Sequence, residues 1–405
     1  MLHQGVLVLN CGSSSIKFSV INVENNKRYF FGFIERLYLP NSCIVWHDQN
    51  KKKNIVFRDY ITHNKALKNI MEILSIYENN IIKKITCIGH RVVHGGMKLN
   101  KSIIINQSVL EEIQKNIIFS PLHNPMNFLG IQFSLQYFPN LINKNVAVFD
   151  TAFYHTLPEH AFLYAIPYYF YKKYNIRRYG AHGISHSYVT HQTSKILKIN
   201  LNCLNIITCH LGSGSSITAI CNGQAVDTSM GLTPLEGLAM GTRSGDLDPS
   251  IIFFMYNILK MNMKEIEIIL NKKSGFLGLM DNITSDFRYI EKKYLLEQSS
   301  YRTVNLFCHR LSKYISAYTT LLDGKLDALV FTGGIGENSS LVRELTVKRL
   351  KLLNLKLDDQ LNNMKFSGSW RFIHFKNSIP IIVIPTNEEL VIANETINLL
   401  KENIV

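Results

Sequence analysis

The chain has 405 residues, of which 46% are hydrophobic and 18% charged, so it can fill the cores of two ordinary domains, and its composition excludes extensive disorder. Its 44 basic and 30 acidic residues give a formal net charge of +14, but most of the excess is lysine spread along the chain. No stripe of interleaved basic and aromatic residues predicts a nucleic-acid partner. No apolar run reaches the roughly 18 residues that cross a bilayer, and the seven cysteines form no Cys-x-x-Cys pair, so we expect a cytoplasmic protein without membrane contact.

Apolar runs predict a strand at residues 6–9 and a second at 16–21, on either side of a polar turn. A strand-like meander then runs to about residue 58, and we interpret the lysine run at 51–53 as a hairpin tip. The pattern next predicts a helix over 67–74, a strand over 85–93, and helices over 108–117 and 128–138. A short buried strand at 146–149 ends at Asp150, and we place the main domain boundary just after that residue.

A similar layout returns about 200 residues later, with a strand at 204–209, a Gly/Ser turn at 210–215 and a strand at 216–220. Two such units predict a duplicated architecture in which each half contributes one phosphate-binding hairpin. Helices follow at 249–259, 263–270 and 301–322, then a strand at 328–332, the glycine segment 333–336 and a helix through residue 350. The chain closes with a strand at 380–384 and a helix at 388–400.

Three segments rich in glycine or serine follow apolar strands: 10–17, 210–216 and 333–338. Such turns let backbone N–H groups approach a phosphate closely, although each one alone is typical of a plain hairpin. Together they predict a nucleotide polyphosphate held between two halves. None matches the P-loop or the Gly-x-Gly-x-x-Gly spacing, so we expect hairpins, not a single helix N-terminus, to hold the phosphates.

Two segments, NCGSSSIKF at 10–18 and YGAHGISH at 179–186, resemble the two signatures of the acetate kinase family. Further matches are GHRVVHGG at 89–96, FDTAF at 149–153, PLEGL at 234–238, MGTRSGD at 240–246, FTGGIGEN at 331–338 and PTNEEL at 385–390. They occur in family order, so the resemblance covers essentially the whole chain. It implies an α/β fold of two related ribonuclease-H-like (actin-like ATPase) domains flanking a nucleotide cleft. Residues 1–150 would form the first domain and 151–385 the second, nucleotide-binding one, with a helix at about 386–405 packing back on the first.

The resemblance implies an acetate kinase, which transfers the γ-phosphoryl group of ATP directly, in line and reversibly to acetate. It also implies Mg²⁺ (or Mn²⁺) and a homodimer. Phosphoryl transfer concentrates negative charge between two anions, so the site must supply cations. Arg91 and Arg243 are the natural pair, since a guanidinium group can bind a carboxylate or phosphoryl group with two hydrogen bonds.

His182 matches the family position that stabilises the transferring phosphoryl group, and we expect it just ahead of a helix that Ser185 caps. The alternatives are a packed core histidine or a zinc site with His186 and His191, although no acidic residue lies among these histidines. Asp150 is expected to orient metal-bound water and an arginine, because acetate is already ionised and needs no base.

Asn10 and Glu388 are expected to complete the Mg²⁺ environment. Lys17, with Ser13 and Ser15 of the phosphate loop, would meet the outer phosphates. By resemblance the remaining ATP contacts are His210, Leu211, Gly212, Ser213, Gly214, Asp286, Phe287, Arg288, Gly334, Ile335, Gly336, Glu337 and Asn338. Ser213 stands where the family usually has Asn, and its shorter side chain favours a water-mediated phosphate contact.

The resemblance places Val93, Leu122, Ala181 and Pro234 around the methyl group of the substrate. Many relatives carry Phe at the Ala181 position, so the smaller residue leaves more room and keeps open a propionate or short-chain acyl kinase. One methylene group discriminates by only about 1–3 kcal/mol. The alternative from another class is an actin-like or chaperone-type ATPase. A sugar kinase would need polar groups for several hydroxyls, which these four residues do not supply.

Overall fold

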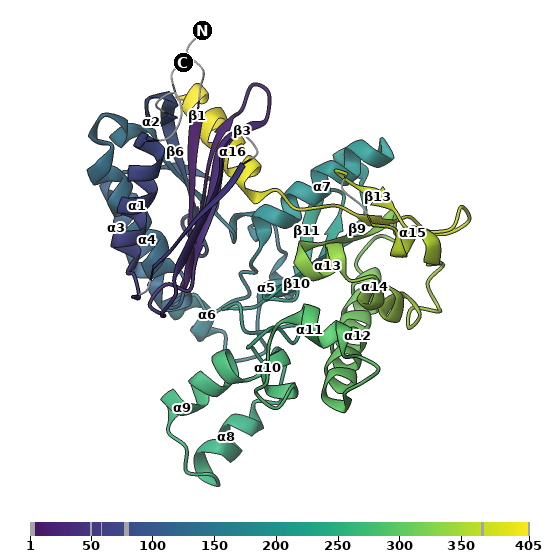
Figure 1. Cartoon of the computed structure of the whole chain (residues 1–405). Helices are drawn as coiled ribbons and strands as arrows, with labels where there is room; N and C mark the ends of the chain where they lie inside the picture. The colour runs from purple at the N-terminus through teal and green to yellow at the C-terminus, as the bar shows by residue number, and fades with distance from the viewer. Residues whose placement is uncertain (1–4, 49–50, 58, 77–80, 366–367, 404–405) are drawn as a thin grey trace. The chain divides into compact units, whose positions relative to one another are not determined.

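The computed structural model describes residues 5–48, 51–57, 59–76, 81–365 and 368–403 (Figure 1). The chain divides into two compact units, one formed by Met1–His155 with Asn387–Val405 and the other by Thr156–Thr386. The sequence placed the first boundary after residue 150 and the second near 386.

The first unit is built on an eight-stranded sheet with the order β5-β4-β3-β2-β1-β6-β8-β7. Its strands are β1 Gly5–Cys11, β2 Ser15–Asn22, β3 Lys27–Glu35, β4 Cys43–Asp48, β5 Lys51–Val56, β6 Ile85–Val92, β7 Ile103–Ile104 and β8 Asn145–Phe149. The first five strands form the predicted antiparallel meander, and β6 and β8 add to β1 in parallel. The interpretation of the lysine run as a hairpin tip is wrong, because β5 begins at Lys51.

Helices cover this sheet, with α1 and α4 beside one face and α16 on the other in Figure 1. They are α1 His63–Ile76, α2 Ile81–Lys84, α3 Gln107–Lys115, η1 Asn116–Phe119, α4 Asn124–Tyr137, η2 Pro139–Lys144, η3 Ala152–Tyr154 and α16 Glu388–Glu402. The predicted period is visible in α1, where Leu67, Ile70, Met71 and Leu74 are buried. The last helix, α16, packs on β6, β1 and β8.

The second unit has a six-stranded sheet with the order β11-β10-β9-β12-β14-β13. Its strands are β9 Ile206–Leu211, β10 Ser215–Cys221, β11 Gln224–Thr228, β12 Ala328–Thr332, β13 Arg371–Phe372 and β14 Ile381–Val383. Strands β11, β10 and β9 are antiparallel neighbours, and β12 and β14 follow in parallel. This is the arrangement of β3, β2, β1, β6 and β8 in the first unit, so the predicted duplication is present in the strand order.

The helices that the structure describes in the second unit are α5 Glu159–Phe162, α6 Tyr169–Tyr174, α7 Gly183–Leu197, η4 Leu201–Cys203, α8 Ser250–Asn257, α9 Met263–Ile268, η5 Ile269–Lys273, α10 Gly275–Leu279, α11 Phe287–Lys292, α12 Gln298–Thr319, α13 Gly333–Asn338, α14 Ser340–Val347 and α15 Asp359–Asn363. Several of them are short and were not predicted by the pattern, such as α5, α6, α10 and α11. In this set, η5 is a π-helical turn.

Two predicted helix starts are corrected by the structure. Helix α7 begins at Gly183 after His182, which takes a left-handed conformation (φ 57°), so Ser185 lies inside the first turn and does not cap it. The helix predicted after residue 336 begins earlier, because α13 starts at Gly333, and it is divided at Ser339, whose side chain caps α14. The third glycine segment is therefore a helix start, and only the first two are hairpins.

The two faces of the second sheet carry different side chains. Ile207, Cys209 and Leu211 of β9 lie in the core cluster that also contains Phe307 and Leu311 of α12. Side chains alternate between the faces of a strand, so the intervening residues Thr208 and His210 face α7. A polar face toward α7 is thus built into the strand. In the described part of the chain, no helix combines the length and apolar character that crossing a membrane requires.

The contact between α16 and β6 depends on Gly89. A Cβ atom at this position would lie 2.5 Å from Thr396 Oγ1 and 2.6 Å from Ile392 Cγ2. We predict that Gly89→Ala lowers the free energy of unfolding by about 1–3 kcal/mol, because the helix must move off the sheet. Chemical denaturation measures this change. Asn398→Ala, at an exposed position of the same helix, is the control and should change it by less than about 0.5 kcal/mol; equal effects would contradict the packing argument.

Candidate functional site

In the first unit, four of the predicted site residues come together around one guanidinium group. Arg91 lies on β6, and its Nε and Nη2 atoms donate to Asp150 Oδ1 and Oδ2 at 3.2 and 2.6 Å. Asn10 Oδ1 of β1 accepts from Arg91 Nη1 at 3.3 Å, and Glu388 Oε2 at the start of α16 lies 4.0 Å from the same nitrogen. Segments far apart in sequence therefore deliver one charged cluster.

The electrostatics of this cluster follow from its burial. Asp150 is fully buried, and Arg91 is largely so. Burial alone would lower the pKa of Arg91, but the carboxylates of Asp150 and Glu388 more than offset that effect and raise the pKa. Arg91 is therefore a permanent cation held by a bidentate ion pair.

The oxygen atoms around Arg91 suit a hard cation. Asn10 supplies an amide oxygen, and Asp150 and Glu388 supply carboxylates, which are the donor types that Mg²⁺ accepts together with water. Among the residues that the structure describes, no three or more His, Cys, Asp or Glu side chains group as a metal-binding set. The oxygen donors that are present fit a Mg²⁺ ion that keeps part of its water shell.

The hairpin between β1 and β2 is the first glycine segment. Its turn is closed by Gly12 N–H, which donates to Ser15 O at 2.7 Å, and Ser13 and Lys17 are exposed. Lys17 pairs with Asn10 across the hairpin. The segment thus presents a hydroxyl group, an ammonium group and the metal-ligand candidate on one turn.

Residues that sequence reasoning missed fix this hairpin in place. His63 Nε2 lies 2.8 Å from Gly12 O. Asn127 of α4 donates to Cys11 O at 2.7 Å and accepts from Val93 N–H at 3.0 Å. One buried amide therefore ties the β1–β2 hairpin to Val93, the residue that follows β6. No local motif marks either residue, because their partners are distant in sequence.

In the second unit, two predicted catalytic side chains converge on the β9–β10 hairpin. A Cβ atom on Gly214 would lie 2.8 Å from Arg243 Nη2 and 3.2 Å from both Cε1 and Nε2 of His182. The His182 ring stacks on His210 with centroids 4.3 Å apart, and its Nδ1 lies 2.9 Å from Ser216 Oγ. Glycine at 214 thus leaves the space that the imidazole and the guanidinium group occupy.

Arg243 is half-buried. Its Nη1 donates to Pro234 O at 2.6 Å, and within the described ranges its side chain forms no ion pair. Partial burial lowers the pKa of Arg243 to about 10, so the group is still protonated at neutral pH. A half-buried cation whose partner in the described structure is a carbonyl oxygen is poised to bind an anion.

A hydrogen-bond network that the sequence did not indicate holds the loop carrying Pro234 and Arg243. Arg178 donates to Thr228 O at 2.7 Å and to Glu236 Oε1 at 2.8 Å, and Tyr164 donates to Glu236 Oε2 at 2.5 Å. Farther along the loop, Gly241 N–H donates to Ser213 O at 2.9 Å. The loop is therefore fixed at both ends and tied to the hairpin beneath Arg243.

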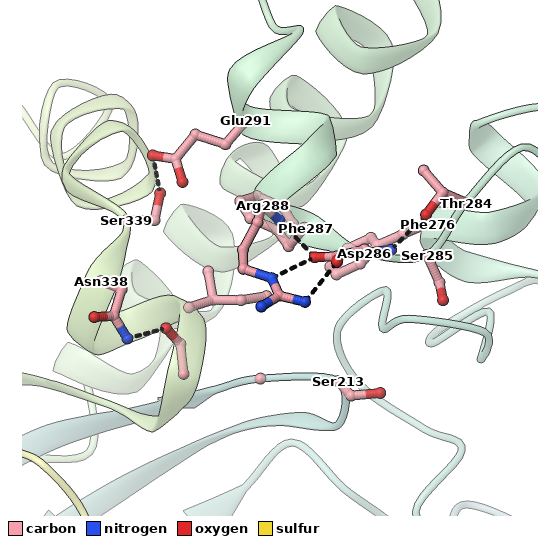
Figure 2. Close-up of a pocket in the computed structure, with 13 residues that line it drawn as sticks. Ser213, Phe276, Thr284, Ser285, Asp286, Phe287, Arg288, Glu291, Asn338 and Ser339 are labelled. Atoms are coloured by element: carbon pink, nitrogen blue, oxygen red, sulfur yellow. Dashed lines mark hydrogen bonds and ion pairs between the residues drawn. The ribbon is translucent and has the colours of Figure 1, made fainter. Parts of the chain in front are cut away.

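A cavity of about 530 Å³ lies beside the same hairpin (Figure 2). It is lined by Gly212, Ser213, Phe276, Thr284, Ser285, Asp286, Phe287, Arg288, Glu291, Gly334, Ile335, Asn338 and Ser339. Eight of these were predicted as ATP contacts, whereas Phe276, Thr284, Ser285, Glu291 and Ser339 were not.

Polar contacts define the mouth and the wall of this cavity. Arg288 and Asp286 form a bidentate pair, with Nε–Oδ1 and Nη2–Oδ2 distances of 3.0 and 2.7 Å. That hydrogen bonding lowers the pKa of Asp286. On the opposite side, Ser339 donates to Glu291 Oε1 at 2.8 Å (Figure 2). The lining of the cavity thus offers both polar and apolar groups, which suit the flat base and the sugar of a nucleoside.

Gly336 and Glu337 belong to α13 but do not line the cavity. Glu337 Oε1 accepts from Gly333 N–H at 2.9 Å and from Thr386 N–H at 3.2 Å, so this carboxylate fixes the start of its own helix. In the structure, Glu337 thus holds the start of α13, the helix whose residues Gly334, Ile335 and Asn338 line the cavity.

The four residues predicted around the substrate methyl group are divided between the two units. Val93 is buried and Leu122 is exposed in the first unit. In the second unit, Ala181 is buried in a small cluster with Met230 and Met240, and Pro234 accepts the hydrogen bond from Arg243.

Known proteins share both the sequence and the fold. The model of the acetokinase family matches residues 5–394. Acetate kinase of Buchnera aphidicola is 55% identical over 395 residues, which cover 98% of this chain and 97% of that protein, and acetate kinase of Escherichia coli is 50% identical over 390 residues, 96% and 97% of the two chains.

Solved structures agree with these relatives. A propionate kinase from Francisella tularensis has a TM-score of 0.91 at 44% identity and covers 98% of this chain and 99% of its own. Acetate kinase from Porphyromonas gingivalis has a TM-score of 0.89 at 38% identity, with 98% and 100% coverage. The predicted α/β fold of the actin-like ATPase class is thereby confirmed, and the chain belongs to the acetokinase family.

Proposed function

We propose that this chain catalyses the reversible transfer of the γ-phosphoryl group of ATP to acetate, which gives ADP and acetyl phosphate. The observation that carries the proposal is the convergence of Arg243, a half-buried cation that forms no ion pair with the described residues, and His182 on the glycine turn at Gly214. A transferring phosphoryl group is the kind of anion that such a pair stabilises.

The roles in the second unit follow from charge and hydrogen bonding. Arg243 compensates the charge that develops on the phosphoryl oxygens, since it reaches the turn without an ion pair to any acidic side chain that the structure describes. His182 donates a hydrogen bond to the same group from Nε2, because its Nδ1 is already engaged by Ser216. The neighbouring cavity receives the adenosine, with Asp286, Phe287 and Arg288 on one side and α13 on the other.

The roles in the first unit depend on the ion pair of Arg91. Asp150 orients Arg91, whose remaining N–H groups bind the acceptor carboxylate. Asn10 and Glu388 would hold Mg²⁺, with Mn²⁺ as a substitute, and the ion would neutralise charge on the ATP phosphates. Lys17 and the hydroxyls of Ser13 and Ser15 contact the outer phosphates. No general base is needed, because acetate is ionised at neutral pH.

Propionate is a second candidate substrate, and Ala181 favours it. The side chain at 181 is a single methyl group packed against Met230 and Met240, and methionine adapts its shape to neighbouring groups. We propose that the acyl chain contacts Ala181, Val93, Leu122 and Pro234. The propionate kinase from Francisella tularensis, which is 44% identical to this chain, is consistent with that choice.

We further propose a cytoplasmic homodimer with residues 1–150 and 151–385 as its two functional domains. ATP as a substrate supports the compartment. The dimer is supported by α8, where Ile251, Phe253, Phe254 and Tyr256 are each 43–60% exposed, because exposed apolar patches mark association surfaces. Light scattering at several protein concentrations measures the mass in solution.

The proposed reaction is tested by trapping acetyl phosphate with hydroxylamine. Purified protein with Mg²⁺-ATP and acetate should form acetohydroxamate at the rate at which ADP appears. ADP release without hydroxamate would instead support an actin-like or chaperone-type ATPase. Replacing acetate by propionate in the same assay compares the two acyl substrates.

We predict that Arg91→Ala and Arg243→Ala each lower kcat by at least about 10²-fold, because each removes a charged contact to the transition state. The hydroxamate assay measures the loss, and the melting temperature of each variant separates it from unfolding. Arg349→Ala, which removes an exposed guanidinium from the second unit, is the control and should retain normal turnover. Near-normal turnover in either test variant would remove that arginine from the site.

We predict that Gly214→Ala lowers kcat by about tenfold or more while the melting temperature changes little. The new methyl group must displace the Arg243 Nη2 atom or the His182 ring, and both can move away without disturbing the backbone. Steady-state kinetics and thermal unfolding together check the claim. A variant that is fully active would show that the two side chains do not act at this turn.

We predict that Ala181→Phe reduces the kcat/KM for propionate relative to that for acetate by about tenfold or more, since the ring takes space next to the acyl chain. The ratio is measured with both substrates on the same enzyme preparation, so that a general loss of folded protein cancels. An unchanged ratio would place Ala181 away from the acyl chain.

A further inference from the structure

A buried chain of hydrogen bonds connects His182 to the interior of the second unit. Ser216 Oγ lies 2.9 Å from His182 Nδ1 and 2.7 Å from His186 Nε2. On the far side of His186, its Nδ1 lies 2.6 Å from Thr208 Oγ1. His186 comes from α7, Thr208 from β9 and Ser216 from β10, so the chain crosses the polar face of the sheet described above.

Behind His182, every residue of this chain of hydrogen bonds is shielded from water. Thr208, His186 and Ser216 have no exposed surface. Burial, followed by the neighbouring His210, holds the pKa of His186 well below its usual value, so its imidazole is neutral. A neutral imidazole has one N–H donor and one acceptor nitrogen, so the bonds on its two sides must run in the same direction.

With neutral imidazoles, the number of protons limits this hydrogen-bond chain to three arrangements. Two hydroxyl groups and two imidazoles carry four protons, and the three hydrogen bonds use three of them. In the first arrangement the surplus proton lies on His182 Nε2. In the second, every bond is reversed and the surplus proton is that of the Thr208 hydroxyl. In the third, both imidazoles donate to Ser216 and the surplus proton is that of the Ser216 hydroxyl.

The surroundings of the two hydroxyl groups decide among the three. Within the part of the chain that the structure describes, the Thr208 hydroxyl has no hydrogen-bonding partner besides His186, and the Ser216 hydroxyl has none besides His182 and His186. If the surplus proton belonged to either hydroxyl, a fully buried O–H group would lack an acceptor, which carries the full desolvation penalty. Thr208 therefore donates to His186 Nδ1, His186 Nε2–H donates to Ser216, and Ser216 donates to His182 Nδ1.

We infer that Thr208, His186 and Ser216 are positioning residues that keep the Nδ1 atom of His182 unprotonated and its Nε2 atom protonated. The inference deepens the proposed function, because it supplies the N–H donor that a phosphoryl oxygen requires. The reverse arrangement would present a lone pair to that anion and repel it. Thr208, which is separated from His182 by His186 and Ser216 along the hydrogen-bond chain, thus decides whether His182 attracts or repels the substrate.

The tautomer can be measured without substrates, and so independently of the proposed reaction. The full-length protein is labelled with ¹⁵N in its histidine rings, and long-range ¹H–¹⁵N spectra are recorded at about pH 8.5, above the usual imidazole pKa. The His182 signals are assigned by their loss in His182→Ala. We expect His182 and His186 each to show a protonated Nε2 and an unprotonated Nδ1. A proton on Nδ1 of His182 in the unmodified protein would overturn the inference.

A variant that does not touch His182 tests the coupling. Thr208→Val removes the hydroxyl group that fixes the direction of the hydrogen bonds. The ¹⁵N chemical shifts of the His182 ring should therefore move toward those of a mixture of the two tautomers. Thr193→Val is the matched control, because that buried hydroxyl bonds only to the carbonyl of Val189 in its own helix. An unchanged His182 spectrum in Thr208→Val, or an equal shift in both variants, would contradict the coupling.

The kinetic consequence separates positioning from general packing. Ser216→Ala removes both central hydrogen bonds, so kcat should fall by about tenfold or more while the KM values for ATP and acetate stay within about twofold. Thr208→Val should lower kcat by about twofold, because an anion can still select the productive arrangement. A loss that appears mainly in KM would assign these residues to structure and refute the positioning role.

Discussion

A half-buried positive charge that no described acidic side chain neutralises is the condition on which the candidate site of the second unit depends. Taking a guanidinium group even partly out of water is costly, and a paired carboxylate is the usual compensation. Arg243 recovers it from one carbonyl oxygen and otherwise stays open to an anion. Such a group stays in place only where the backbone around it is rigid, which explains why the loop is held by Arg178, Glu236 and Tyr164.

The two candidate arginines, one in each unit, illustrate two electrostatic arrangements. Arg91 is paired with Asp150, so its charge is permanent and its orientation fixed before any ligand binds. Arg243 forms no ion pair with the described residues, so its attraction to an anion is not shared with an acid among them.

The repeated pattern of strand, Gly/Ser turn and strand was sufficient to predict the duplicated sheets, because apolar runs and turn residues are local signals. Helix starts were less predictable. Ser185 looks like a cap, but the left-handed backbone of His182 moves the first turn forward, and Ser185 instead contacts His210 and Thr386. A conformation at positive φ in a residue other than glycine is set by tertiary contacts, which the local sequence does not contain.

The residues of the candidate site likewise divide into those that the sequence predicted and those that it did not. Eight cavity residues could be predicted, because they lie in segments that resemble a known family. Phe276, Glu291 and Ser339 reach the cavity through helix packing and a hydrogen bond across 48 residues, so no local pattern marks them. Asn127 and Ser216 escaped notice for the same reason: each bridges groups that only the folded chain brings together.

The return of the chain to its first unit has a consequence for biosynthesis. The segment Asn387–Val405 completes that unit, yet all of Thr156–Thr386 is translated before it. At about 5–20 residues per second, the roughly 230 intervening residues take on the order of 10–50 seconds to emerge. During that interval the face of β6 that will receive α16 stays uncovered, and Glu388 has not been made. The first unit can therefore complete its fold only after α16 has been translated, long after the rest of that unit has left the ribosome.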